Sequence, residues 1–423
     1  MHVSLVGSEM CIRDSTSIGY QSLLANTTGN NQVAVGSNAL DANTTGLYNT
    51  AVGSAALTSS TDGNNNVAIG YQALDSNVSG SDSVAVGKGA LQAFTGSSSV
   101  GGSVGVGRDA LYSLTTGESH VAIGENAGYS VTTGNNTVAI GKLALYANTG
   151  NDNTAVGHQT LQANTTGTNN VAVGRDALND NTTGDSNTAV GVYALDASSG
   201  ANENTAMGYQ SLTSCTTGEG HAAFGWRSLT ACTTANDNTA FGHAAVRDTT
   251  TGAENTAVGR AALQVNTTGS NNTVLGSNAL IANTTASNNV AIGRRAMYGN
   301  TTGTANVAIG YQALYTNTTQ SENVAVGYNA LYNAAGNNNT AVGTEAGENL
   351  TTGYANTMMG HRAGEELTTS YQTTAIGAYA LDDCTTGIKN TALGWDAGGN
   401  VTTANHSVYI GTDAGDGHTT GGN

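Results

Sequence analysis

The chain has 423 residues, of which 10% are charged and 58 are glycine, with no proline and a net charge of −17. Compact domains carry about 25% charged residues and about 5% proline, so this composition argues against a set of ordinary globular domains. The acidic balance argues against nucleic acid as a partner, because phosphate binding needs a dense cationic surface, and no apolar run approaches the roughly 20 residues that cross a bilayer.

Residues 1–15, MHVSLVGSEMCIRDS, share nothing with the rest of the chain. They resemble translated sequencing-adapter sequence, so we treat them as a non-native leader and leave them out of the fold prediction. Residues 16–423 are expected to form a single continuous repeat array. The array starts and stops within a rung, and its last residues, DGHTTGGN, carry no polar cap. Since solenoids need capped ends for solubility, we expect either a fragment of a longer protein or ends that stack on other copies.

A glycine recurs twenty-four times, from Gly19 to Gly411, within the consensus N-[VT]-A-[VI]-G-x-x-A-L-x-x-N-T-T-G-x-x. The spacing is 17 residues throughout, except for 20 before Gly107 and 16 before Gly157 and Gly343. A fixed period over the whole array is typical of a stacked solenoid, in which each repeat packs only on its neighbours. The sequence therefore predicts an all-β parallel β-solenoid of about 24 rungs.

Each repeat contains a short alternating segment, such as Val307-Ala308-Ile309 before Gly310. Alternation with period 2 predicts a strand. We expect the large residues to face the core and the alanine and glycine side to form an outer face that contacts other chains. The alternative is that the flat alanine and glycine side reflects tight packing inside the solenoid. The Ala-Leu pair after the glycine predicts a second short strand. Asn-Thr-Thr-Gly predicts a turn, with side chains that bond their own backbone and a glycine that tolerates a positive φ.

Five repeats carry glycine where leucine is usual. Four of these place an apolar residue three positions later, where asparagine is usual: Val131, Leu350, Leu367 and Val401. Losing a buried leucine would cost about 2–5 kcal/mol. The later side chain is therefore expected to fill the same core space.

The phrases NNVAIGYQAL (65–74), NVAVGRDAL (170–178) and NVAIGYQAL (306–314) resemble the head repeats of trimeric autotransporter adhesins, the YadA-like heads. Similar repeats occur in phage tail-fibre-like proteins. The resemblance implies a left-handed parallel β-roll, a homotrimer with three chains side by side, and a role in surface attachment.

The expected function is that of a structural, surface-exposed fibrous repeat protein, acting as an adhesin head or fibre shaft at the cell surface. One alternative is a self-assembling extracellular filament subunit that stacks head to tail. The other is a phage tail-fibre segment on the virion. The expected partners are further copies of the chain and a host-surface glycan or protein, with no nucleic acid and no membrane contact within this segment.

Nothing in the sequence resembles a catalytic constellation, because no motif such as G-x-S-x-G follows a strand and opens a helix. The eight histidines are scattered, and the Asp pattern of calcium-binding β-roll repeats is absent. We therefore predict no enzymatic activity, no cofactor and no metal site.

Eight Asn-Thr-Thr triplets are formal N-glycosylation acceptors. The alternative is a ladder in which the stacked side-chain amides hydrogen-bond from rung to rung. These asparagines are Asn26, Asn43, Asn164, Asn181, Asn266, Asn283, Asn300 and Asn317.

The two residues after the repeat glycine carry most of the aromatic and cationic side chains. Aromatic residues and arginine on an exposed edge suit contacts with a glycan or protein. The alternative is that these residues have no ligand and simply occupy the variable, outward-facing positions of each rung. The residues of this contact edge are Tyr209, Trp226, Arg260, Arg294, Arg295, Tyr311, Tyr328 and Trp395.

Three cysteines, Cys215, Cys232 and Cys384, occupy the place where the turn usually begins with asparagine. Cys215 and Cys232 are 17 residues apart, so the solenoid would stack them in adjacent rungs about 4.7–4.9 Å apart. That distance lies within the range of a disulfide. The pair is expected to form either a disulfide or two stacked thiols, and Cys384 is expected to be a lone thiol.

Overall fold

The computed structural model describes residues 14–96 and 102–420, so most of the predicted leader lies outside the described residues. Every regular element in the described residues is a strand, and no helix there is long and apolar enough to cross a membrane. The chain forms two compact units. The first comprises residues up to Gln210 together with Ser214–Thr217, and the second comprises Ser211–Thr213 and the residues from Gly218 onward.

Within its described residues the first unit contains twelve strands of three residues each, and successive strands of this unit pair in parallel register. The strands are β1 (Thr16–Ile18), β2 (Val33–Val35), β3 (Thr50–Val52), β4 (Val67–Ile69), β5 (Val84–Val86), β6 (Val104–Val106), β7 (Val121–Ile123), β8 (Val138–Ile140), β9 (Thr154–Val156), β10 (Val171–Val173), β11 (Thr188–Val190) and β12 (Thr205–Met207).

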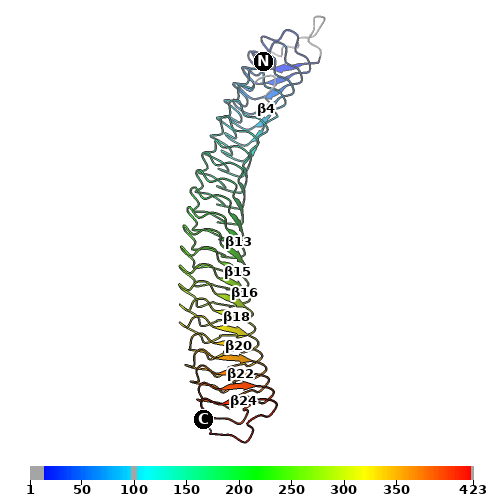
Figure 1. The fold of residues 1–423 in the computed structure, drawn as a ribbon. Coiled ribbons are helices and arrows are strands. Elements are labelled where there is room, and N and C mark those ends of the chain that lie inside the picture. The colour runs from blue at the N-terminus through cyan, green and yellow to red at the C-terminus, as the bar shows by residue number, and fades with distance from the viewer. Residues whose placement is uncertain (1–13, 97–101, 421–423) are drawn as a thin grey trace. The chain divides into compact units, whose positions relative to one another are not determined.

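The second unit repeats this arrangement, and Figure 1 shows the strands of each unit stacked like the rungs of a ladder. Its strands are β13 (Ala222–Phe224), β14 (Thr239–Phe241), β15 (Thr256–Val258), β16 (Thr273–Leu275), β17 (Val290–Ile292), β18 (Val307–Ile309), β19 (Val324–Val326), β20 (Thr340–Val342), β21 (Thr357–Met359), β22 (Thr374–Ile376), β23 (Thr391–Leu393) and β24 (Val408–Ile410). The predicted parallel β-solenoid with a repeat of about 17 residues is confirmed.

The two sides of each strand differ in burial. In β18 the middle residue, Ala308, is completely buried, whereas Ile309 keeps 37% of its surface exposed. The same pattern recurs along both units, so the prediction that the large strand residues face the core is wrong. The interior is narrow: a Cβ added at Gly105, the middle residue of β6, would lie 3.3 Å from both Leu91 Cγ and Ala110 O. Leucines from the opposite wall fill most of this space. They leave room for a small side chain, which is a methyl group in most rungs and the isopropyl group of Val274 in β16.

The remainder of each rung is a series of turns rather than the predicted second strand. The core leucine lies in these turns with a positive φ, as Leu314 does at 52°. The turn glycines, such as Gly303, are not among the residues with positive φ, so the predicted turns form without using that tolerance of glycine. Leu314 is completely buried, and burying one such side chain contributes about 1.5–3 kcal/mol.

The repeat glycine is required for two physical reasons. Gly259 has a φ of 134°, a conformation that residues with a side chain rarely adopt. A Cβ added there would lie 2.7 Å from the carbonyl oxygen of Gly276 in the next rung. The close stacking of rungs at this corner therefore needs glycine in each of them.

The repeats that have glycine in place of leucine keep a filled core, as predicted. Val131, Leu350, Leu367 and Val401 are completely buried. A Cβ added at Gly364 would lie 2.6 Å from Leu367 Cδ1, so Leu367 occupies the vacated space. The middle residue of β21, Met358, contributes as well, because its Sδ would lie 2.7 Å from a Cβ at Gly347.

Candidate functional surfaces

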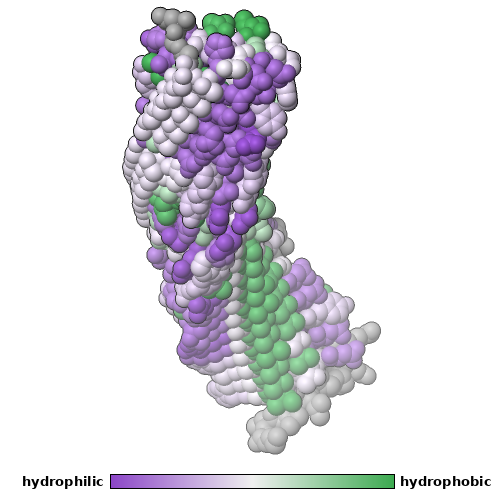
Figure 2. All heavy atoms as spheres, turned by 90° about the horizontal axis from the view of Figure 1, so that it is seen from below, coloured by the Kyte–Doolittle hydropathy of each residue, from purple (hydrophilic) through white to green (hydrophobic). Residues whose placement is uncertain are grey.

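The first and third residues of the strands line an uncharged surface on each unit. We call it the aliphatic face because its third residues are all large and apolar, whereas half of the first residues are threonine. Exposed fractions reach 40% for Ile69, 55% for Phe241 and 49% for Leu275. None of the 24 strands contains a charged residue. Figure 2 shows an uninterrupted hydrophobic stripe of this kind along one side of part of the molecule. Because soluble monomers rarely expose long contiguous apolar patches, such a surface marks a site of interaction.

The turn asparagines form ladders along the stack. Asn181 Nδ2 donates to Asn164 Oδ1 at 2.8 Å, and Asn283 Nδ2 donates to Asn266 Oδ1 at 2.8 Å. Asn317 Nδ2 donates to Asn300 Oδ1 at 2.9 Å. The ladder alternative for the eight Asn-Thr-Thr asparagines therefore has direct structural support.

Seven of these eight asparagines are completely buried, and Asn26 is half-buried. Asn43 Nδ2 reaches back to Asn26 Oδ1 at 3.3 Å. A glycan attached to Nδ2 would need that nitrogen to face solvent. The ladder and glycosylation therefore exclude each other at the buried positions of the folded chain.

A second ladder, which the sequence analysis did not identify, runs through the asparagine that precedes each strand. Asn306 Nδ2 donates to Gln320 O at 2.8 Å, and Asn306 Oδ1 accepts from the backbone nitrogen of Asn323 at 2.9 Å. The same two bonds recur from rung to rung, as for Asn255. This pre-strand asparagine satisfies backbone groups that would otherwise be buried without partners. The sequence does carry a signal for this ladder, because asparagine is the first residue of the repeat consensus.

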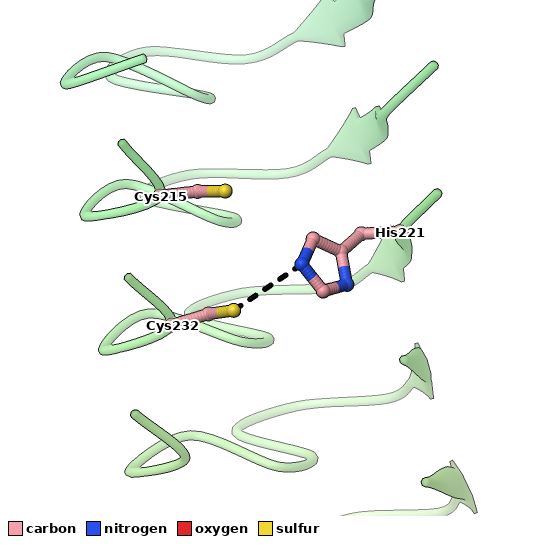
Figure 3. Close-up of side chains that lie close together, drawn as sticks. All are labelled: Cys215, His221 and Cys232. Atoms are coloured by element: carbon pink, nitrogen blue, oxygen red, sulfur yellow. Dashed lines mark hydrogen bonds between the residues drawn. The ribbon is translucent and has the colours of Figure 1, made fainter. Parts of the chain in front are cut away.

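His221 takes the place of one pre-strand asparagine and makes the equivalent bonds. Its Nε2 lies 2.7 Å from Ala235 O, and its Nδ1 accepts from Asn238 N at 3.2 Å. Figure 3 shows the ring pointing toward Cys232, whose Sγ is 3.3 Å from Nε2. Because Nδ1 accepts, Nε2 carries the proton and donates it, which gives a neutral imidazole in a structural role.

All three cysteines in the described residues are buried thiols. The disulfide between Cys215 and Cys232 is therefore not formed. Cys232 Sγ contacts His221 Nε2. Cys215 belongs to the first unit and Cys232 to the second, and the stacking of the two thiols stays a prediction. Burial raises the pKa of Cys384 to about 11, so this thiol stays protonated and unreactive near neutral pH.

The predicted contact edge lies on the surface, and several of its residues pair along the stack. Tyr209, Trp226, Tyr328 and Trp395 expose 42%, 41%, 49% and 51% of their surfaces. The Arg294 guanidinium lies 5.8 Å from the centroid of the Tyr311 ring, which stacks on Tyr328 at 5.5 Å.

The remaining residues of the edge are also accessible. Arg260 is exposed, and Arg295 is half-buried with its guanidinium 5.7 Å from the Tyr298 ring. Trp226 stacks on His243 with ring centroids 4.5 Å apart. The edge therefore presents aromatic and cationic groups to solvent, as glycan or protein contacts require.

A carboxylate cluster lies beside this edge in the second unit. Oxygens of Glu345, Glu348 and Glu365 lie within 4.8 Å of one another. Arg362 pairs with Glu365 and lies 3.8 Å from Glu345, and Asn329 donates to Glu348 at 3.0 Å. Burial is the main cause that raises the pKa of Glu348. Oxygen ligands of this kind suit a hard cation, and here Arg362 already places one positive charge against two of the three carboxylates.

Two tyrosine columns stand on the outer surface. Each column has three rings from successive rungs: Tyr112, Tyr129 and Tyr146 in the first unit, and Tyr298, Tyr315 and Tyr332 in the second. Neighbouring centroids are 4.9–5.2 Å apart, with interplanar angles between 3° and 15°.

No model of a known protein family matches the chain, and no curated protein is similar to it in sequence. The likeness to adhesin head repeats therefore depends on the repeat phrases, and the functions that it implies stay predictions.

Proposed function

We propose that the chain is a structural, surface-exposed fibrous repeat protein that acts as an adhesin head or fibre shaft outside the cell. In this proposal the solenoid supplies a regular scaffold rather than a catalytic site, and it associates with further copies of itself through the aliphatic face. The observation that carries the proposal is the exposed, uncharged face along the strands of each unit.

Charge supports self-association through this face. The chain carries a net charge of −17, and like charges on two copies would repel. All of that charge lies off the strands, because none of them contains a charged residue. Two copies can therefore bring their aliphatic faces together without burying an unpaired charge, which would be costly.

Geometry favours a second copy as the occupant. The outer side chains recur at the strand spacing of about 4.8 Å, so a partner with the same period can interdigitate along the whole face. Twelve strands, each about 10 Å long, present a footprint of about 600 Å² per unit. Pairing two such footprints would remove about 1,200 Å² from water, above the roughly 1,000 Å² that a specific interface needs.

The contact edge supports the second part of the proposal, attachment to a host-surface glycan or protein. Trp395 and Tyr328 expose about half of their surfaces, and Arg294 is exposed beside Tyr311. Aromatic and arginine side chains dominate binding energies at protein interfaces. Changing both Arg294 and Arg295 to serine is expected to weaken binding to host surfaces without altering the circular dichroism spectrum.

Sedimentation velocity of the full chain tests self-association. We expect a discrete particle heavier than one chain, and a shift to the mass of one chain when Ile292, Ile309 and Val326 are changed to lysine. The matched control replaces the same residues with threonine, which other strands already carry at outer positions and which should weaken association less. A wild-type chain that sediments as a monomer at every concentration would contradict the proposal. Concentration-dependent fibres would favour the head-to-tail filament instead.

A further inference from the structure

The tyrosine columns suggest a chemistry that goes beyond the proposed structural role. Six of the 17 tyrosines occupy one repeat position, the residue after the core position that is usually leucine, and they form two uninterrupted runs of three. At that position other rungs carry residues such as Asp41, Gln162 and Arg247. The tyrosines are thus concentrated in consecutive rungs, where each ring lies against the next.

The geometry of the columns limits what they can bind. The rings are nearly parallel, at 12° for Tyr129 and Tyr146 and 6° for Tyr315 and Tyr332. The face of an inner ring such as Tyr315 is covered by its neighbours on both sides. A sugar that stacks on ring faces would find both faces of the inner rings, Tyr129 and Tyr315, occupied. What a column presents to solvent is a row of ring edges, and all six side chains are half-buried, so small solutes reach them.

We propose that the two tyrosine columns are sites of oxidative cross-linking, at which a peroxidase-type oxidant joins the rings of successive rungs as dityrosine. Each of two neighbouring phenols gives up one electron and one proton to the oxidant. The two phenoxyl radicals couple through a new carbon–carbon bond between ortho positions. The ortho hydrogens then move to the phenol oxygens as the rings regain aromaticity. One hydrogen peroxide is reduced to two waters, which accounts for the two electrons and two protons that are lost.

The stack favours coupling within one chain over coupling between chains. Parallel strand pairing fixes the register of successive rungs, so the phenols of one column cannot diffuse apart. A radical formed on Tyr315 has two partners: the centroid of its ring lies 5.2 Å from that of Tyr298 and 4.9 Å from that of Tyr332. Tyr48 provides the contrast: it is 59% exposed, but the same position carries Asn31 and Asn65 in the rungs before and after it.

The experiment treats dilute full-length protein with peroxidase and hydrogen peroxide. Dityrosine is measured by its blue fluorescence, and mass spectrometry of proteolytic fragments identifies which residues are joined with the loss of two hydrogens. We expect links between neighbours within each column. Tyr315→Phe keeps a stacked ring but removes the phenol that both links in the second-unit column need. These links should disappear, while those among Tyr112, Tyr129 and Tyr146 remain as an internal control.

Tyr48→Phe is the matched surface control and should leave the yield of dityrosine unchanged. The stacked pairs Tyr311–Tyr328 and Tyr354–Tyr371 are expected to couple by the same geometry. The proposal would be overturned if Tyr48, or another tyrosine that does not stack on a second tyrosine, were linked as often as the residues of the columns. It would equally be overturned if the yield of dityrosine per chain rose with protein concentration, because that indicates coupling between chains. A third contrary outcome is a yield of links in the second unit that Tyr315→Phe does not lower. Circular dichroism of both variants confirms that the solenoid is intact.

Discussion

The inner and outer sides of each strand differ in side-chain size and in exposure, and this difference recurs along the chain. On the inner side, alanines such as Ala308 are completely buried, as are the leucines of the opposite wall such as Leu314. On the outer side, residues such as Ile309 have larger apolar side chains and yet are partly exposed. In most globular proteins the larger apolar residue lies inside. The reversal shows that interior width, rather than hydrophobicity, decides which residue this solenoid buries.

The largest expected effect comes from placing a charge on each side of one strand. Ala308→Asp would bury a carboxylate without a partner, and uncompensated buried charges typically cost about 3–5 kcal/mol. Ile309→Asp puts the same group on the partly exposed side and should cost less than about 1 kcal/mol in a dissociated chain. Hydrogen exchange of the amides in β17–β19 measures both effects locally. Greater loss of protection in Ile309→Asp would reverse the assignment of the two sides.

The rungs with glycine in place of leucine allow the core to be rearranged. Leu367→Asn alone should destabilise its rung by about 2–5 kcal/mol, because it empties the space that Leu367 fills. Gly364→Leu alone should clash with Leu367, since an added Cβ already lies 2.6 Å from Leu367 Cδ1.

The double variant Gly364→Leu/Leu367→Asn, made in a chain that also carries Met358→Ala, restores the consensus rung. The third change is needed because a Cβ at Gly364 also lies 3.1 Å from Met358 Cγ. Leucine tolerates the local φ of 60°, because Leu314 adopts 52° at the same position. The thermal midpoint of the double variant should recover much of the loss seen in the single variants. Additive losses would show that the two side chains do not share one core site.

The pre-strand ladder tests the polar part of the inner side. Asn306→Ala removes the amide that bonds Gln320 O and the backbone nitrogen of Asn323. Each buried group left without a partner costs about 1–3 kcal/mol. Asn306→His should be tolerated better, because His221 already makes the equivalent pair of bonds. Chemical denaturation of the two variants provides the comparison, and equal losses would contradict the proposed role of the asparagine.

The smallest expected effect is a dependence of stability on pH. Burial, followed by the charges of Asp180 and Asp176, raises the pKa of Asp196 from 3.8 to about 6. The folded chain therefore holds this proton to a higher pH than the unfolded chain does. Stability should fall as pH rises from about 4 through 6 and should change little above that range for this group.

Asp196→Asn should reduce this slope in thermal denaturation measured between pH 4 and pH 7. Glu203→Gln, which removes a carboxylate from an exposed position, should leave the slope as it is. A slope of opposite sign, or one that Asp196→Asn does not alter, would contradict the assignment.

The repeat period predicted much of this structure. A glycine every 17 residues indicated parallel rungs in register, and the turn asparagines indicated a ladder. Glycine in place of leucine correctly predicted that Leu350 and Leu367 would fill the core. These features depend only on which residues recur at a fixed spacing, which the sequence displays directly.

Which strand face points inward could not be read from the same pattern. Alternation separates two sides of a strand but does not show the width of the space that either side meets. The positive φ of leucines such as Leu314 also departs from ordinary preferences, since side chains disfavour that conformation. Likewise, the structure is needed to explain why Met358 replaces alanine as the middle residue of β21, because it shows that the side chain lies against Gly347.

The most direct test compares the chemical reactivity of two neighbouring residues after each is replaced by cysteine. Ala308→Cys and Ile309→Cys are made in a chain that carries Cys11→Ser and lysine at Ile292 and Val326 to prevent association. The native thiols in the described residues are buried, so the background is low. We predict that the cysteine at 309 reacts rapidly with a thiol reagent, whereas the one at 308 reacts only upon unfolding. Rapid reaction at 308 with protection at 309 would contradict the account.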